Sequence, residues 1–178
     1  MAKSIADRLT YAFEILEVDP SDRILEIGCG YGAAASLICG RLVDGKITAI
    51  DQSEKMIRAA EKLNAPFVSA GKAIFLAAPL HEADLGHSRF NKIFAVNVNL
   101  FWMKAARELE RIRELLLPGG TLYLFNQPPS AGKLRSIADS TGQNLADAGF
   151  TVKQIKIGDQ KPIPVVCVIA VGGQDRIV

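Results

Sequence analysis

The stretch ILEIGCGYGAA, residues 24–34, places three glycines at alternate positions directly after an apolar segment. Ile24–Ile27 is typical of a buried β-strand, and the alanine-rich segment Ala33–Leu42 predicts the helix that follows it. A ligand at such a strand-to-helix turn meets unpaired backbone N–H groups and the positive end of the helix dipole. Glycine lets the backbone approach that ligand and also accepts a positive φ. The stretch therefore predicts a ligand site at the carboxyl end of the first strand.

A second apolar run, Ile47–Ile50, ends on an acid, Asp51. Ligands of open α/β sheets bind beyond the carboxyl ends of the strands, so this carboxylate lies beside the predicted site and can accept both hydroxyls of a ribose. The glycines and the acid together predict a ligand that carries a nucleoside. Gly28, Gly30 and Ala33 also fit the dinucleotide fingerprint, and Asp51 follows at about the 20-residue spacing expected for NAD. The glycines alone do not decide between a dinucleotide such as NAD and another ligand that carries a nucleoside.

The rest of the chain alternates predicted strands and helices, which predicts a mostly parallel sheet with helices on both faces. The last two strands have no helix between them and predict an antiparallel hairpin. The fold class expected is α/β, a doubly wound seven-stranded sheet in a single domain, 1–178, with an N-terminal helix (1–18) over the site and a core at 24–171. The predicted strands are Ile24–Ile27, Ile47–Ile50, Ala73–Ala78, Lys92–Val98, Thr121–Phe125, Thr151–Ile157 and Val165–Val171. The predicted helices are Ile5–Val18, Ala33–Leu42, one capped by Ser53 and ending at Leu63, Trp102–Leu117 and Lys133–Ala148, the last followed by Gly149 as its cap.

Composition narrows the class of protein. A chain of 178 residues suits one domain, and its formal net charge of +2 argues against nucleic acid or an anionic membrane as the main partner. No stretch approaches the ~20 apolar residues of a membrane span. The three cysteines, Cys29, Cys39 and Cys167, show no metal-binding spacing and are odd in number, so neither a disulfide framework nor a metal site is expected. We expect a cytoplasmic protein.

Four segments resemble a known family when they are taken together: VDPSDRILEIGCGYG, ITAIDQSEKMI, FNKIFAVNV and LLLPGGTLYL. In this order and at these separations they resemble the class I S-adenosylmethionine-dependent methyltransferases, from about Asp19 to Val171. The resemblance implies a Rossmann-like fold, S-adenosylmethionine as cofactor and S-adenosylhomocysteine as product. It includes the final antiparallel hairpin.

The same resemblance implies the residues that hold the cofactor. Gly28, Gly30 and Gly32 would line its methionine and ribose portion, with Glu26 supporting the loop. Asp51 would hold the ribose hydroxyls. The adenine would be flanked by Gln52 and Met56, and the sulfonium end would lie beside Asn97.

Two positions depart from the family pattern. The third strand usually ends in an acid that contacts the adenine amino group, whereas this chain reads Ala77-Ala78-Pro79, so adenine recognition at Ala78 would rest on backbone and apolar contact. Asn91 stands where the family usually has an aspartate, and we expect little consequence because it keeps a polar turn.

The segment Asn126-Gln127-Pro128-Pro129 resembles the Asn/Asp-Pro-Pro-aromatic signature of enzymes that methylate nitrogens. That signature follows the fourth strand, has no intervening residue and ends in an aromatic residue. The present segment follows the predicted fifth strand and continues into Ser130. We interpret the double proline as fixing a loop beside the substrate cleft.

Methyl transfer is an in-line displacement from an activated leaving group, so positioning can supply much of the rate and a general base is needed only for a protonated acceptor. The catalytic residue stays unknown, and His81 is a weak candidate. Tyr11, Phe101 and Trp102 are candidates to line an apolar site for a small-molecule acceptor, and a homodimer is possible. Two alternatives stay open: a non-catalytic or weakly cofactor-binding descendant of the fold, and an NAD-dependent oxidoreductase.

Overall fold

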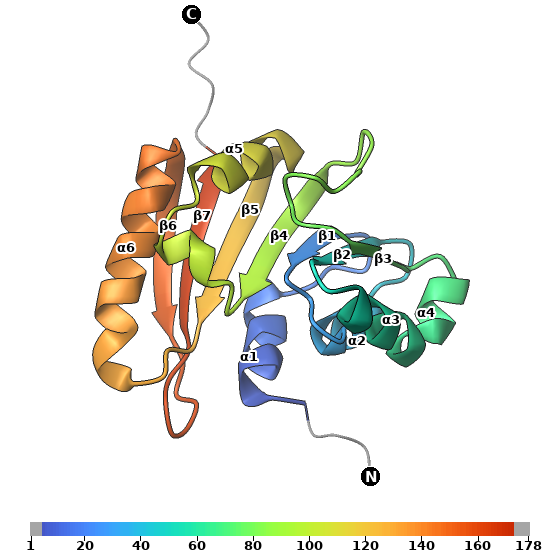
Figure 1. The fold of residues 1–178 in the computed structure, drawn as a ribbon, viewed down its shortest axis with the longest axis horizontal. Helices are drawn as coiled ribbons and strands as arrows, with labels where there is room; N and C mark the ends of the chain where they lie inside the picture. The colour runs from blue at the N-terminus through green and yellow to red at the C-terminus, as the bar shows by residue number, and fades with distance from the viewer. Residues whose placement is uncertain (1–4, 173–178) are drawn as a thin grey trace, which may run out of the picture.

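The computed structural model describes residues 5–172. It contains one seven-stranded sheet with the strand order β3-β2-β1-β4-β5-β7-β6 (Figure 1). Strands β1 to β5 pair in parallel, and β7 pairs antiparallel with both β5 and β6. The strands are β1 (Arg23–Ile27), β2 (Lys46–Asp51), β3 (Ala73–Ala77), β4 (Phe90–Val96), β5 (Leu116–Asn126), β6 (Phe150–Ile157) and β7 (Val166–Gly172). The predicted doubly wound fold with a C-terminal antiparallel hairpin is confirmed.

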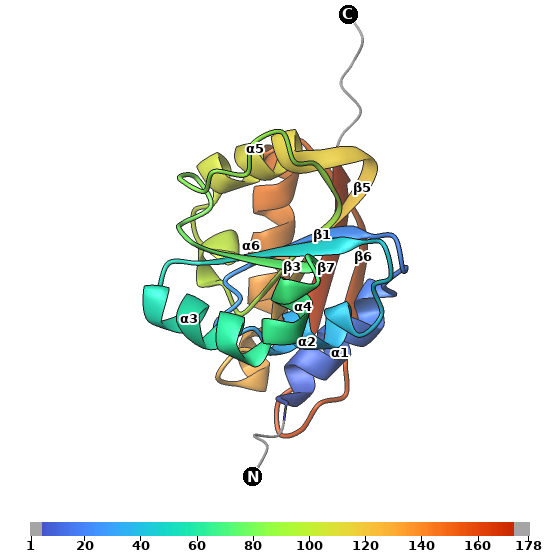
Figure 2. The same ribbon diagram turned by 90° about the vertical axis from the view of Figure 1, so that its right-hand side faces the viewer.

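Helices cover both faces of this sheet. Figure 2 shows α5 and α6 on one side of it and α1 to α4 on the other. Alternate residues of the buried strands supply the two cores, because successive side chains of a strand point to opposite faces: Leu25 and Ile27 pack with α5 and α6, whereas Ile24 packs with α1, α2 and α3. The helices are α1 (Asp7–Leu16), α2 (Ala33–Cys39), α3 (Glu54–Leu63), α4 (Ala65–Ser69), η1 (Asn99–Trp102), α5 (Ala106–Leu115), η2 (Ala131–Lys133) and α6 (Leu134–Asp147).

The strand order reverses at β1, which has β2 on one side and β4 on the other. Ile27 is in register with Ile50 of β2 and with Ala95 of β4, so these three strands end at one edge of the sheet. The segments that leave them turn to opposite faces and open a crevice between them. Such a switch point is where open α/β sheets bind ligands.

Several boundaries differ from the sequence prediction. Helix α1 stops at Leu16 because Glu17 adopts a left-handed conformation with φ 44°. The helix predicted up to Leu117 divides into η1 and α5, and it ends early because Leu116 pairs with Phe90 in the sheet. The following Pro-Gly-Gly lies within β5, where the register shifts. Helix α4 was not predicted.

Residues 1–4 of the predicted N-terminal segment and residues 173–178 lie outside the described part of the chain. Across residues 5–172, no helix has both the length and the apolar character needed to cross a membrane.

Candidate active site

The glycine loop after β1 has the backbone conformation that only glycine adopts without strain. Gly28, Gly30 and Gly32 have φ of 74°, 53° and 79°. A Cβ on Gly28 would lie 2.7 Å from Cγ2 of Val98, and one on Gly32 would lie 2.8 Å from Cβ of Ala60. A Cβ on Gly30 would meet no atom within 4 Å. Two glycines therefore allow close packing, and Gly30 leaves bare backbone facing open space.

Asp51 joins this loop to the end of β2. Its Oδ2 accepts a hydrogen bond of 2.8 Å from the Gly30 N–H, and its Oδ1 accepts one of 2.9 Å from the Ser53 N–H. The Ser53 hydroxyl also accepts from the Met56 N–H, which confirms Ser53 as the N-cap of α3. Each carboxylate oxygen has a second lone pair, so the held carboxylate can still accept hydrogen bonds from a ligand.

Glu26 lies behind the glycine loop and is 3% exposed. Its Oε2 has no hydrogen-bond partner among the described residues. Burial, with a further contribution from nearby Asp51, raises the pKa of Glu26 from 4.5 to about 8. A buried carboxyl group without a partner is costly once it is charged. The carboxyl group therefore keeps its proton near neutral pH, and a cationic ligand beside it would favour the carboxylate form.

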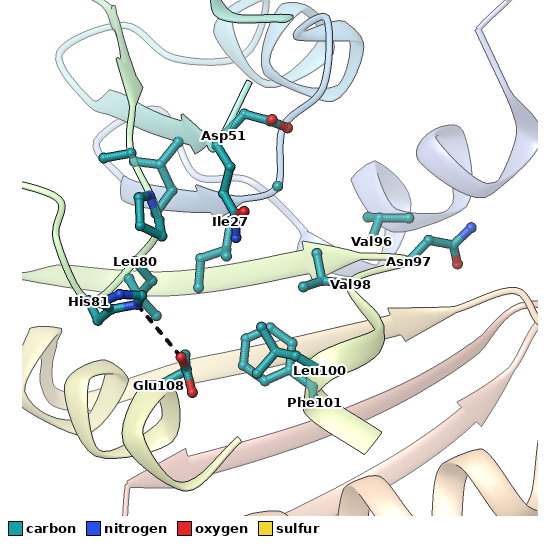
Figure 3. A pocket seen from close by; sticks show the side chains of 15 residues that line it. Ile27, Asp51, Leu80, His81, Val96, Asn97, Val98, Leu100, Phe101 and Glu108 are labelled. Atoms are coloured by element: carbon teal, nitrogen blue, oxygen red, sulfur yellow. Dashed lines mark ion pairs between the residues drawn. The ribbon is translucent and has the colours of Figure 1, made fainter. Parts of the chain in front are cut away.

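A cavity of about 400 Å³ lies in front of this loop, between the carboxyl ends of β1, β2 and β4 (Figure 3). The structure brings six of the predicted cofactor or substrate residues to its wall, together with the weak catalytic candidate. These residues are Gly28, Asp51, Gln52, Ala78, Asn97, Phe101 and His81. Phe101 is also part of the core, at 1% exposed.

Other predicted residues lie outside this wall. Gly30 and Gly32 belong to the loop, and Glu26 lies behind it. Met56 is 39% exposed at the start of α3. Tyr11, on α1, is partly buried and packs edge-to-face on Phe125 of the core, with ring centroids 6.2 Å apart.

His81 lies at the opposite end of the cavity from Asn97 (Figure 3). Its Nε2 is 3.2 Å from Oε1 of Glu82, and its Nδ1 is 3.8 Å from Oε1 of Glu108. Glu108 comes from α5 and also lines the cavity. Glu108 was not predicted from the sequence, because it is one of several acidic residues on a charged amphipathic helix and no pattern distinguishes it from the others.

A second cavity, of about 670 Å³, adjoins the first at Asn97, which lines both. Trp102, from η1, lines this second cavity. So does the Asn126-Gln127-Pro128-Pro129 segment, which follows the fifth strand as expected. Asn97 has φ 57°, and its Oδ1 accepts a 2.8 Å hydrogen bond from the Gln127 N–H. That bond ties the end of β4 to the end of β5.

Comparison with known proteins agrees with this geometry. Residues 24–120 match the family model described as a methyltransferase domain. An uncharacterized methyltransferase of Bacillus subtilis (strain 168) is 30% identical over 87% of this chain and 86% of its own length. A trans-aconitate 2-methyltransferase of Paracidovorax citrulli is 30% identical over 74% of this chain, which spans about half of that protein, 52%.

Solved structures share the fold. Magnesium protoporphyrin IX methyltransferase from Synechocystis PCC 6803, solved with bound S-adenosylmethionine, matches with a TM-score of 0.68 and 18% identity over 94% of this chain and 77% of its own. The family match and the relative from Bacillus subtilis support S-adenosylmethionine as the cofactor over the NAD-dependent alternative. With its glycine loop, its acid at the end of β2 and its C-terminal hairpin, the chain belongs to the methyltransferase-domain family and is a class I S-adenosylmethionine-dependent methyltransferase.

Proposed function

We propose that this protein transfers the methyl group of S-adenosylmethionine to a small-molecule acceptor. The observation that carries the proposal is the buried Glu26 carboxyl, which lies behind a loop that presents bare backbone at Gly30 and whose Oε2 has no partner in the described part of the chain. A sulfonium nucleoside with a methionine tail brings positive charge to that place. The names of the trans-aconitate and protoporphyrin methyltransferases support a small acceptor.

The described residues fit such a cofactor. Asp51, fixed by two backbone N–H groups, would accept the ribose hydroxyls. Gln52 and Ala78 line the part of the cavity where adenine would lie. β3 ends without an acid, and Glu108, near the His81 imidazole, would accept the adenine amino group in its place. His81 is then a positioning residue and not a base.

The cofactor, when bound, supplies a methyl group already activated by the sulfonium. The residues of the chain have the task of orientation. Asn97, held by Gln127, marks the junction of the two cavities, where the acceptor would meet the methyl group. Good alignment of two reactants can contribute up to ~7–11 kcal/mol. S-adenosylhomocysteine is the expected product.

Calorimetry with S-adenosylhomocysteine and NADH tests the cofactor. We expect binding of the first alone, and Asp51→Ala should weaken it by about 1–3 kcal/mol, the scale of lost hydrogen bonds to a charged group. Asp44→Ala, an exposed acid before the other end of β2, is the matched control and should bind as the parent does. An unchanged affinity in Asp51→Ala would refute the ribose contact. Absence of binding by the parent would favour the non-catalytic descendant.

A further inference from the structure

The second cavity is bounded by elements that are far apart in the sequence. Trp102 comes from η1, Asn126 and Pro128 from the end of β5 and the loop after it, and Lys133 and Ser136 from the start of α6. Among the described lining residues, Asn97 alone is shared with the proposed cofactor cavity. A molecule bound there is thus placed next to, and not within, the nucleoside site.

Asn126 is a largely buried polar side chain that lines the second cavity, at 4% exposed. Its side-chain amide has no hydrogen bond to another residue of the range 5–172. Because its amide atoms are not among the fully enclosed unpaired atoms, they are accessible to a molecule in the cavity. Oδ1 of Asn97 accepts a hydrogen bond from the Gln127 N–H, and this leaves the Nδ2 group of Asn97 available as a donor. Both amides can donate to a ligand.

The charge in this cavity has one sign. Lys133 lies at its edge, exposed, and has no ion-pair partner within the described chain. The first turn of the 14-residue helix α6 lies along the cavity, contains no acid, and adds the positive end of its dipole. The described lining residues include no aspartate, glutamate or histidine. The cavity attracts an anion, and its described lining has no carboxylate or imidazole that could act as a base.

We propose that this second cavity is the methyl-acceptor site and that its acceptor is a small carboxylic acid, methylated on a carboxylate oxygen. The inference rests on the proposed function, because it takes S-adenosylmethionine as the methyl donor. A carboxylate is deprotonated at neutral pH and needs no general base. Amide and ammonium donors are the groups that bind it, and Trp102 with the two prolines gives the cavity an apolar wall for the rest of the molecule.

The proposed step balances without any further reactant. A lone pair of the carboxylate oxygen forms the bond to the methyl carbon, and the bond from that carbon to sulfur breaks. The electron pair stays on sulfur, which changes from a sulfonium to a thioether. The products are a methyl ester and S-adenosylhomocysteine, and no proton moves.

The test uses the full chain and S-adenosylmethionine with a tritiated methyl group. The probes are fumarate, citrate and benzoate, with fumaramide, benzamide and benzyl alcohol as uncharged counterparts. Methyl esters release volatile methanol in alkali, whereas methyl ethers and N-methyl amides do not. We expect alkali-labile tritium with at least one acid and with none of the uncharged compounds.

Two variants tie this activity to the cavity. Lys133→Met and Asn126→Asp should lower kcat/KM for the acid by on the order of 10- to 100-fold, because each removes or opposes a charged hydrogen bond. Arg135→Met is the matched control, since the Arg135 side chain is 94% exposed, reaches Asp139 and lies outside the described cavity lining. S-adenosylhomocysteine affinity should be the same in all three, which shows that the variants are folded.

The outcomes separate the two proposals. Failure of S-adenosylhomocysteine to bind the parent protein overturns the proposed function and this inference with it. The inference alone is overturned if that ligand binds but the product is alkali-stable, or if Lys133→Met and Asn126→Asp behave like Arg135→Met. It is equally overturned if no acid is methylated and none shifts the melting temperature of the protein saturated with S-adenosylhomocysteine.

Discussion

Asp22 lies at the amino end of β1 and β4 and is 2% exposed. Its carboxylate accepts hydrogen bonds from the Lys92 ammonium at 2.7 Å, from the Asp19 N–H at 2.8 Å and from the Asn91 amide. At the carboxyl end of β1, Glu26 is 3% exposed and its Oε2 has no hydrogen-bond partner among residues 5–172. The residue before β1 thus carries a buried carboxylate that is paired, and the strand itself carries a buried carboxyl group that is not. The first is typical of a structural network, and the second of a ligand site.

The backbone shows the same contrast. The glycines after β1 and Asn97 after β4 have positive φ, at the end where the cavities lie. At the other end, Asn91 accepts a 2.6 Å hydrogen bond from the Arg23 N–H and joins the two strands. Asn91 therefore does more than keep a polar turn. The paired network thus fixes the amino ends of β1 and β4 to each other, whereas their carboxyl ends lead into the residues that line the cavities.

The largest expected effect is at the paired end. Asp22→Ala leaves the Lys92 ammonium, whose side chain is 13% exposed, without its carboxylate. The free energy of unfolding should fall by about 3–5 kcal/mol, the cost of stranding one partner of a buried pair. Urea denaturation measures it. Asp22→Leu combined with Lys92→Met should recover most of the loss, and a double variant as unstable as the single one would show that the pair is not the reason.

The glycine loop should show the next largest effect. Gly32→Ala combines a positive φ with a clash against Ala60 and should destabilise the protein by roughly 2–4 kcal/mol. Gly30→Ala meets only the backbone cost of about 1–2 kcal/mol. Its methyl group should nevertheless weaken S-adenosylhomocysteine binding, measured by calorimetry. Equal stability of the two variants would contradict the packing role of Gly32.

Glu26 should make stability depend on pH. Because its pKa is about 8 in the folded protein and near 4.5 when unfolded, the folded state holds the extra proton between these values. The contribution of Glu26 to the free energy of unfolding is therefore fully present below about pH 4.5 and is lost as the pH rises through 8. We expect a loss of roughly 1–3 kcal/mol, because the interior of a protein screens charge more than a dry medium does. Denaturation of Glu26→Gln should lack this fall.

The same side chain gives a binding readout. A cationic ligand favours the carboxylate, so binding of S-adenosylmethionine below pH 8 should release a proton, detected by calorimetry in buffers of different ionisation enthalpy. Glu26→Gln should bind more weakly and release none. Equal proton release in parent and variant would assign the titration to another group.

The smallest expected effect is at Ser53. Ser53→Ala removes the N-cap bond of 3.3 Å to the Met56 N–H but keeps the backbone bond to Asp51. The free energy of unfolding should fall by about 0.5–1 kcal/mol, which is measured as a lower melting temperature. The affinity for S-adenosylhomocysteine should change little. A large loss of affinity would mean that the hydroxyl also positions the carboxylate.

Features set by neighbouring residues could be predicted from the sequence. The strands showed as apolar runs, the glycine turn as three small residues, and the Ser53 cap as a hydroxyl before a helix, and the structure confirms all three. The boundary after α5 could not be predicted, because Leu116 leaves the helix to pair with Phe90, a residue distant in the chain. Glu108 and Lys133 were not predicted, because nothing in the sequence around them marks them as lining a cavity formed by separate elements.

The sequence by itself determined the order of strands and helices, the family and the place of the nucleoside loop, because periodicity, glycine φ and capping act over a few residues. Only the tertiary structure decided that Oε2 of Glu26 lacks a partner within residues 5–172, that Asn126 lines a second cavity and that Asn97 lines both cavities. These facts depend on which side chains from separate elements meet once the sheet register and the helix positions are fixed.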